Sequence, residues 1–264
     1  MSHTPRPDIL EAGSGHRVIL VHSSVAGARQ WRRLMDVLEP DFHAVAVNLY
    51  GYGGTAPWQD RRAQTLRDQA ELIGTLLPED GGSVSIVGHS FGGAVAMKAA
   101  ALYKDRVRRL VLIEPNPFYL LNLQGREDAY MEAIRLRGVI KACGATGNWR
   151  QAAEAFAEYW TGEGSWAAMP ADRQAKFAEA LKPNFHEWDA VMGEDTPLSD
   201  WVRDLPGDTC VIISEDTVGS IRAIASLLEE AAPHWTYRRI ARGGHMAALS
   251  MADEINPIVA QALR

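Results

Sequence analysis

A serine at the apex of a Gly-x-Ser-x-Gly string is the residue of this chain best placed to do chemistry. The string covers residues 88–92 with Ser90 at its centre, follows the apolar run 84–87 and leads into the helix-favouring run 94–101. A strand, a tight turn and a helix in this order strain the serine backbone and lift its hydroxyl clear of a sheet. The flanking glycines avoid a Cβ that would collide with neighbouring elements. The pattern predicts a nucleophilic serine, and hence an enzyme, rather than an ordinary turn.

A serine hydroxyl is a weak nucleophile until a base takes its proton, and histidine is the base suited to neutral pH. Among the eight histidines, His245 lies between the strand-like run 235–240 and the predicted last helix. Two glycines precede it and let the loop bend, so that the imidazole reaches over the edge of the sheet. We therefore expect His245 to be the base, although without Ser90 it would be interpreted as a solvated loop residue.

The third member of such a site is a carboxylate that orients the imidazole and stabilises its protonated form. Two candidates follow predicted buried strands, where ligands bind in open parallel sheets: Glu114 after 110–113 and Asp216 after 210–213. Asp216 is also well suited to cap the helix that follows it. Glu114 precedes a proline at the end of a buried strand, where a carboxylate is costly without a partner. The cost of burying an unpaired carboxylate favours Glu114, with Asp216 as the alternative.

Hydrogen-bond donors for the developing negative charge are expected from two places. The loop 21–27 follows the first predicted strand and can turn a backbone N–H towards Ser90, and the N–H of Phe91 supplies a second donor. Each donor of this kind typically lowers the barrier by ~3 kcal/mol. The glycine-rich loop 48–55 lies at the same edge, but no Gly-Lys-Ser/Thr follows it, so a phosphate cradle is not expected.

The elements that must position these residues alternate between short apolar strands and helices at both ends of the chain. This alternation predicts an α/β fold, with a mostly parallel sheet and helices on both faces. The predicted strands are 17–21, 43–47, 84–87, 110–113, 210–213 and 235–240, and the predicted covering helices are 28–39, 62–77, 92–103, 219–231 and 252–263. The segment before Val18 has room for only one further short strand.

Between residues 117 and 199 the alternation stops. Half of the eight tryptophans lie in this block. Four helical stretches follow one another there without a strand, at 126–142, 148–160, 170–182 and 184–193. The simplest interpretation is an all-helical cap, inserted at 117–199 between core segments 1–116 and 200–264. It would lie over the carboxyl ends of the strands.

Composition limits the classes of function. A net charge of −6 gives no basic footprint for nucleic acid, and no apolar run approaches the ~20 residues that span a bilayer. The N-terminus lacks the apolar core of a signal peptide, and two cysteines without metal-ligand spacing favour a reducing cytoplasm. We expect a cytoplasmic protein with no metal or other cofactor, no membrane partner and no nucleic-acid partner. The expected partner is a small-molecule substrate, and the composition is compatible with a homodimer.

These motifs together resemble the α/β-hydrolase superfamily over nearly the whole chain. The resemblance is carried by His22-Ser23-Ser24 with Trp31, Leu49-Tyr50-Gly51-Tyr52-Gly53, residues 88–93, Glu114-Pro115 and Gly243-Gly244-His245. It implies that Ser90 is the nucleophile, that His245 is the base and that the backbone N–H groups of Ser24 and Phe91 form the oxyanion hole. It also implies that the helical block is the cap domain of this superfamily.

Departures from the superfamily pattern concern the oxyanion loop and the acid. The usual His-Gly is His22-Ser23 here, which narrows the loop but still leaves a backbone donor. The last acid usually sits three residues after a glycine that closes the penultimate strand. Ser214 replaces that glycine, Asp216 comes one residue early, and Thr217 occupies the expected place. Some members carry the acid after the strand that follows the nucleophile, which is the position of Glu114.

The predicted function is hydrolysis of an ester, lactone or related activated carbonyl of a small, mostly apolar substrate through an acyl-enzyme. A serine rather than an aspartate at position 90 argues against the dehalogenase and epoxide hydrolase chemistry that the resemblance would otherwise allow. Two alternatives use the same serine scaffold, namely hydrolysis of carbon–carbon bonds and cofactor-free perhydrolase activity. A ligand-binding protein without catalysis is a further alternative, because a fold alone does not fix a function.

Overall fold

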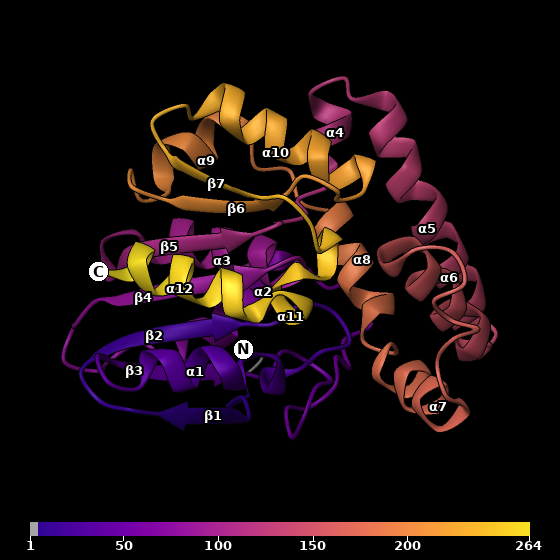
Figure 1. Cartoon of the computed structure of the whole chain (residues 1–264), viewed down its shortest axis with the longest axis horizontal. Helices are drawn as coiled ribbons and strands as arrows, with labels where there is room; N and C mark the ends of the chain where they lie inside the picture. Colours follow the sequence, from indigo (N-terminus) through magenta and orange to yellow (C-terminus); the bar gives the residue numbers. More distant parts are fainter. Residues whose placement is uncertain (1–4) are drawn as a thin grey trace.

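A seven-stranded sheet forms the centre of the protein in the computed structural model, which describes residues 5–264 (Figure 1). Its spatial order is β1-β3-β2-β4-β5-β6-β7, and every neighbouring pair is parallel except β1 with β3. The strands are β1 (Ile9–Ala12), β2 (His16–Val21), β3 (Phe42–Val47), β4 (Val84–His89), β5 (Val107–Ile113), β6 (Cys210–Ser214) and β7 (Thr236–Ile240). The predicted mostly parallel sheet is therefore confirmed, with one short antiparallel strand ahead of Val18.

Helices cover both faces of the sheet, as the near-continuous apolar strands predict. All residues of β4 and β6 are buried, because neither face of these strands meets solvent. One face packs against α1 and α12, and the other packs against α2, α3 and α10. These helices are α1 (Arg32–Leu38), α2 (Leu66–Gly74), α3 (Phe91–Tyr103), α10 (Gly219–Ala231) and α12 (Ala252–Leu263).

The order of the strands creates a crevice at the carboxyl ends of β2 and β4. The chain runs from β2 to β3 on one side and then crosses to β4 on the other side of β2. The loops that follow β2 and β4 consequently diverge, and ligands of open α/β sheets bind at such a reversal. Ser24 lies in the loop after β2 and Ser90 directly follows β4, so the two lie on either side of this crevice.

An all-helical block lies beyond one end of the sheet (Figure 1). Its four main helices correspond to the four predicted ones: α5 (Glu127–Ala145), α6 (Trp149–Thr161), α7 (Ala171–Ala180) and α8 (Asn184–Met192). They contact one another, and α6 also contacts the segment that carries His245. We call α5 to α8 the cap. Within residues 5–264, no helix is both long and apolar enough to cross a membrane.

Two short helices that flank the cap in the sequence escape the sequence prediction. α4 (Tyr119–Leu123) and α9 (Leu198–Asp204) are too short to show a helical period, and both contact α10 of the core. α9 buries Leu198 and Trp201. The predicted boundary between residues 199 and 200 therefore falls inside α9, whose packing joins it to the core.

Candidate active site

The turn at Ser90 has the strained geometry that its sequence predicts. The backbone of Ser90 lies at φ 56°, in a region that side-chain-bearing residues seldom adopt. A Cβ on Gly88 would lie 2.3 Å from the carbonyl oxygen of Gly92, and a Cβ on Gly92 would lie 2.3 Å from that of Val21. Glycine is thus required on both sides because α3 and β2 approach the turn so closely. The tight packing holds Ser90 at the mouth of the crevice.

Ser90, His245 and Glu114 form one hydrogen-bonded line. The Ser90 hydroxyl lies 2.7 Å from Nε2 of His245, and Nδ1 of His245 lies 2.8 Å from Oε2 of Glu114. All three are buried, with exposed fractions of 4%, 2% and 1%. Because an ionised carboxylate only accepts hydrogen bonds, Nδ1–H donates to Glu114 and leaves Nε2 free to accept from Ser90. The arrangement has the tautomer and the geometry of a nucleophile, its base and an orienting acid.

Glu114 is held in place by residues of the segment that follows β6. Its Oε1 accepts a 2.7 Å hydrogen bond from the backbone N–H of Ser214, and its Oε2 accepts another of 2.7 Å from Oγ1 of Thr217. The backbone of Glu114 itself is strained, with φ at 45°. Thr217, at the position where the resemblance would place an acid, is therefore a donor to the acid of the neighbouring strand.

Asp216 bonds to the loop before His245 rather than to its imidazole. Its carboxylate accepts hydrogen bonds from Oγ of Ser214 at 2.5 Å and from the backbone N–H groups of Gly243 and Gly244 at 3.1 and 2.7 Å. These bonds, that of Ser214 foremost, lower the pKa of Asp216. The structure thus separates the two candidate carboxylates: Glu114 meets the imidazole, whereas Asp216 is exposed and fastens the loop that precedes His245.

The backbone N–H groups of Ser24 and Phe91 are both available for an oxyanion. Neither donates to an acceptor within residues 5–264, and both residues line the cavity beside the Ser90 hydroxyl. Ser23, which replaces the usual glycine, directs its backbone N–H and its hydroxyl to Oε1 of Gln30 at 3.0 and 2.8 Å. Its side chain is therefore satisfied without occupying the place of the two donors.

A carboxylate from the cap fixes the side chain of Ser24. Oγ of Ser24 donates to Oε2 of Glu187 at 2.5 Å, and Oε1 of Glu187 accepts from the hydroxyl of Tyr52 at 2.8 Å. The same Tyr52 hydroxyl accepts the backbone N–H of Val25, and Asn184 donates to Oε2 of Glu187 at 2.8 Å. Burial raises the pKa of Glu187. Sequence reasoning missed this group, because Ser24 and Glu187 lie 163 residues apart and no local motif links them.

His89 joins the oxyanion loop to the loop that carries His245. Its Nε2–H donates to the backbone carbonyl of His245 at 2.9 Å, and its Nδ1 accepts from Nε2 of Gln30 at 3.1 Å. Burial lowers the pKa of His89 to about 3 and that of His22 to about 4. Both imidazoles are therefore neutral where His245 must work.

These two buried histidines should make the fold sensitive to acid. Their pKa values in the folded protein lie below the unfolded value of about 6.5, so the unfolded chain binds more protons below that pH. The free energy of unfolding should fall as the pH drops from 6.5 towards 4, by about 1.4 kcal/mol per pH unit for each histidine. Urea unfolding of the wild type and of His89→Gln between pH 4.5 and 7 measures this.

Glutamine at position 89 keeps one donor and one acceptor but does not titrate. The slope of stability against pH in the acid range should therefore be smaller in His89→Gln by about one histidine's share. Equal slopes in the two proteins would contradict the assignment of a neutral, buried His89.

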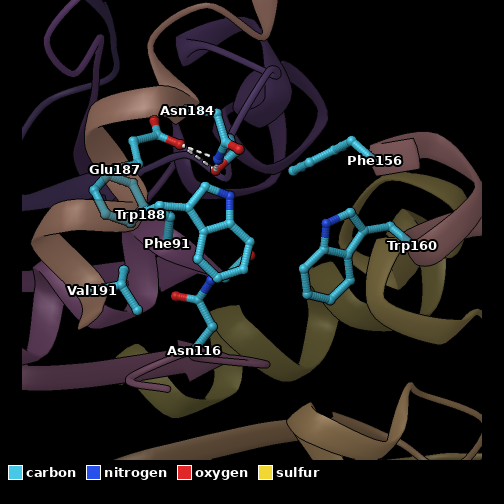
Figure 2. Close-up of a pocket in the computed structure, with 10 residues that line it drawn as sticks. Phe91, Asn116, Phe156, Trp160, Asn184, Glu187, Trp188 and Val191 are labelled. Atoms are coloured by element: carbon cyan, nitrogen blue, oxygen red, sulfur yellow. Dashed lines mark hydrogen bonds between the residues drawn. The ribbon is translucent and has the colours of Figure 1, made fainter. Parts of the chain in front are cut away.

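A small cavity lies between Ser90 and the cap. Figure 2 shows the indoles of Trp160 and Trp188 on opposite sides of it, with Asn184 towards one end and Asn116 towards the other. The lining residues are Ser24, Ser90, Phe91, Asn116, Phe156, Trp160, Asn184, Glu187, Trp188 and Val191. The indole of Trp160 also stacks on the His245 ring, with ring centres 3.9 Å apart. A cap residue thus covers the imidazole directly.

A larger outer cleft adjoins this inner cavity. It has a volume of about 520 Å³ and is bordered by α6, α7 and the residues that follow His245. Ser24, Phe156 and Trp160 line both spaces, whereas Ser90 lines only the inner one. The two aromatic side chains therefore form a partition between Ser90 and the outer cleft.

A sequence model described as "Alpha/beta hydrolase family" matches residues 18–258. The chain is 36% identical over 155 residues to lipase LipV of Mycobacterium tuberculosis, a match that covers 57% of the chain and 51% of the lipase. It is 37% identical over 112 residues to 2-hydroxy-6-oxo-6-(2'-aminophenyl)hexa-2,4-dienoic acid hydrolase of Metapseudomonas resinovorans, covering 39% of the chain and 37% of that protein. The chain thus spans about half or less of the length of these relatives.

Solved structures show the same fold along the whole chain. The bromoperoxidase from Bacillus anthracis superposes with a TM-score of 0.77 at 17% identity, covering 97% of this chain and 94% of the other. At this level of identity the likeness concerns the fold alone.

Proposed function

Because the chain belongs to the alpha/beta hydrolase family, we propose that it is a serine hydrolase that cleaves an ester, a lactone or a related activated carbonyl compound through an acyl-enzyme. The observation that carries the proposal is the buried line of Ser90, His245 and Glu114, with its two hydrogen bonds of 2.7 and 2.8 Å. In this proposal Ser90 is the nucleophile, His245 the base and Glu114 the acid that orients it.

Acylation begins when Oγ of Ser90 attacks the carbonyl carbon and its proton passes to Nε2 of His245. Glu114 stabilises the imidazolium that forms, and the N–H groups of Ser24 and Phe91 receive the negative charge on the carbonyl oxygen. The tetrahedral intermediate collapses as His245 returns the proton to the leaving oxygen, which departs as the alcohol.

Deacylation repeats these steps with water. His245 takes a proton from a water molecule, whose oxygen attacks the acyl carbon, and the proton then returns to Oγ of Ser90 as the carboxylic acid is released. No group beyond those of the chain and water is needed to balance the reaction.

The two spaces beside Ser90 support separate binding places for the acyl group and the leaving group of the substrate. Ser90 and Phe91 line the inner cavity together with the aromatic rings of Phe156, Trp160 and Trp188, so the acyl group belongs there. The outer cleft includes Met246 and so adjoins the residue that must protonate the leaving group. The small inner volume and these aromatic rings favour a compact, mostly apolar acyl group.

Reaction with a fluorophosphonate tests the proposed function. Oγ of Ser90 should attack phosphorus and expel fluoride while His245 takes the proton, which leaves one phosphonyl group per chain. Mass spectrometry of the digested protein should place the group on Ser90, and hydrolysis of short-chain aryl esters should fall in parallel. A protein that acquires no adduct would be a ligand-binding member of the family rather than a hydrolase.

Hydrolysis of a carbon–carbon bond is the second candidate, supported by the partial match to a dienoic acid hydrolase. The same serine, base and donors serve that reaction. An assay with a 2-hydroxy-6-oxo-hexa-2,4-dienoic acid, followed by loss of its conjugated absorbance, separates the candidates when compared with the aryl esters.

A further inference from the structure

Four buried polar atoms on side chains that line the inner cavity have no partner in the part of the protein that the structure describes. They are Nε1 of Trp160, Nε1 of Trp188, Oδ1 of Asn116 and Oδ1 of Asn184, none of which forms a hydrogen bond within residues 5–264. All four side chains are at least nine-tenths buried. Unpaired buried polar atoms are costly, so a group in this cavity that pairs with them gains free energy. Two donors and two acceptors call for a ligand that both accepts and donates.

The charges around the inner cavity disfavour a negatively charged ligand. Among the described lining residues there is no lysine or arginine, and the only carboxylate is that of Glu187. Glu187 accepts hydrogen bonds from Ser24, Asn184 and Tyr52, which are all neutral. Arg173 is the one cation among the described residues that line the adjoining outer cleft. A negative charge beside Ser90 would thus meet a buried carboxylate and no cation.

A carboxylate on the acyl group is therefore strongly disfavoured. Moving an anion out of water into an apolar site is costly unless a cation or several donors compensate it. The nearby Glu187 adds repulsion, so that either the substrate or Glu187 would have to take up a proton. A neutral amide or hydroxyl of the same size has neither penalty and pairs with both kinds of unpartnered atom.

We propose that the inner cavity selects an uncharged acyl group that carries a hydrogen-bonding substituent, such as a carboxamide or hydroxyl, and that Glu187 rejects acidic acyl groups. The proposal rests on the hydrolase function proposed above and narrows its substrate class. It sets this site apart from one built for a dienoic acid, whose carboxylate is ionised at neutral pH.

Three methyl esters of nearly equal shape test the proposal. Methyl succinamate ends in a carboxamide, methyl 4-methylpentanoate in an isopropyl group and monomethyl succinate in a carboxylate. At pH 7.5, kcat/KM should be highest for the amide and at least about 100-fold lower for the carboxylate, since like charges in a poorly solvated site cost several kcal/mol. Methanol release measures turnover. Protection of Ser90 from a fluorophosphonate measures binding where turnover is slow.

The variant Glu187→Gln tests the effect of the negative charge of Glu187 alone. Glutamine keeps the size of the side chain and can still bond to Ser24 and Tyr52, whose hydroxyls rotate. The ratio of the amide ester to the carboxylate ester should shrink by about 10-fold or more, while the ratio of the amide to the isopropyl ester, which carries no charge, should change little. An effect on folding or on the oxyanion loop alone would lower all three rates together and leave both ratios as they were.

The outcomes separate this inference from the proposed function. Equal or faster cleavage of monomethyl succinate, or equal protection by it, would overturn the inference while the hydrolase assignment stands. An unchanged ratio in Glu187→Gln would overturn the role given to Glu187. Failure of the fluorophosphonate to label Ser90 would instead overturn the proposed function itself.

Discussion

Replacing Ser90 by alanine should lower kcat for an aryl ester by about 10⁶-fold, the loss seen when a serine nucleophile is removed from a catalytic triad. The acyl-enzyme cannot form without Oγ, and the remaining donors supply only a small residual rate. Alanine adds no new clash at the strained turn, because the Cβ is already present in serine. Ester hydrolysis and fluorophosphonate labelling, measured on the same preparation, provide the check.

Ser199→Ala is a suitable control for this experiment, since Ser199 is exposed on α9 and lines neither space beside the nucleophile. It should keep wild-type activity. If Ser90→Ala were still labelled, or kept more than a small fraction of the activity with its fold intact, the nucleophile would have to be another residue.

Replacing Glu114 by glutamine should reduce kcat by about 10⁴-fold. The backbone N–H of Ser214 requires an oxygen at the position of Oε1, so the amide nitrogen of glutamine would face His245. That NH₂ donates to Nδ1 and so forces the proton onto Nε2, the wrong tautomer for accepting from Ser90. Thr217 does not oppose this orientation, because its hydroxyl can rotate to accept.

Asp216→Asn is the matched comparison. Its carboxylate bonds to the loop before His245 and does not reach the imidazole, so kcat should fall by about 10-fold at most. A loss of orders of magnitude in Asp216→Asn, together with a mild effect of Glu114→Gln, would reverse the assignment of the acid.

Much of the fold and the centre of the site follow from local sequence patterns. Apolar runs such as 84–87 and 210–213 predict buried parallel strands, and the glycines around Ser90 predict the strained turn. The cost of burying Glu114 without a partner favoured it over Asp216, and the structure gives it three hydrogen-bond donors. Here local physics was enough, because Ser90 and Glu114 each directly follow a buried strand that its apolar run reveals.

The parts that could not be predicted depend on contacts between distant segments. The pairing of Ser24 with Glu187 and the line from Ser23 through Gln30 and His89 arise only once the cap and the loops are packed. From the sequence, tryptophans on the cap helices could equally be packing residues or line a cavity. Trp160 does both. The helix α9 was missed because seven residues are too few to show a period.

The cap of this protein has a bearing on how such enzymes diversify and on how they could be engineered. It contributes six of the ten residues that line the inner cavity, yet Ser90, Glu114 and His245 all lie outside it. Transplanting another cap would therefore exchange the recognition surface without disturbing the reacting groups. The graft would have two compatibility requirements, namely an acceptor for the hydroxyl of Ser24 where Glu187 now stands and a ring against His245 where Trp160 now stacks.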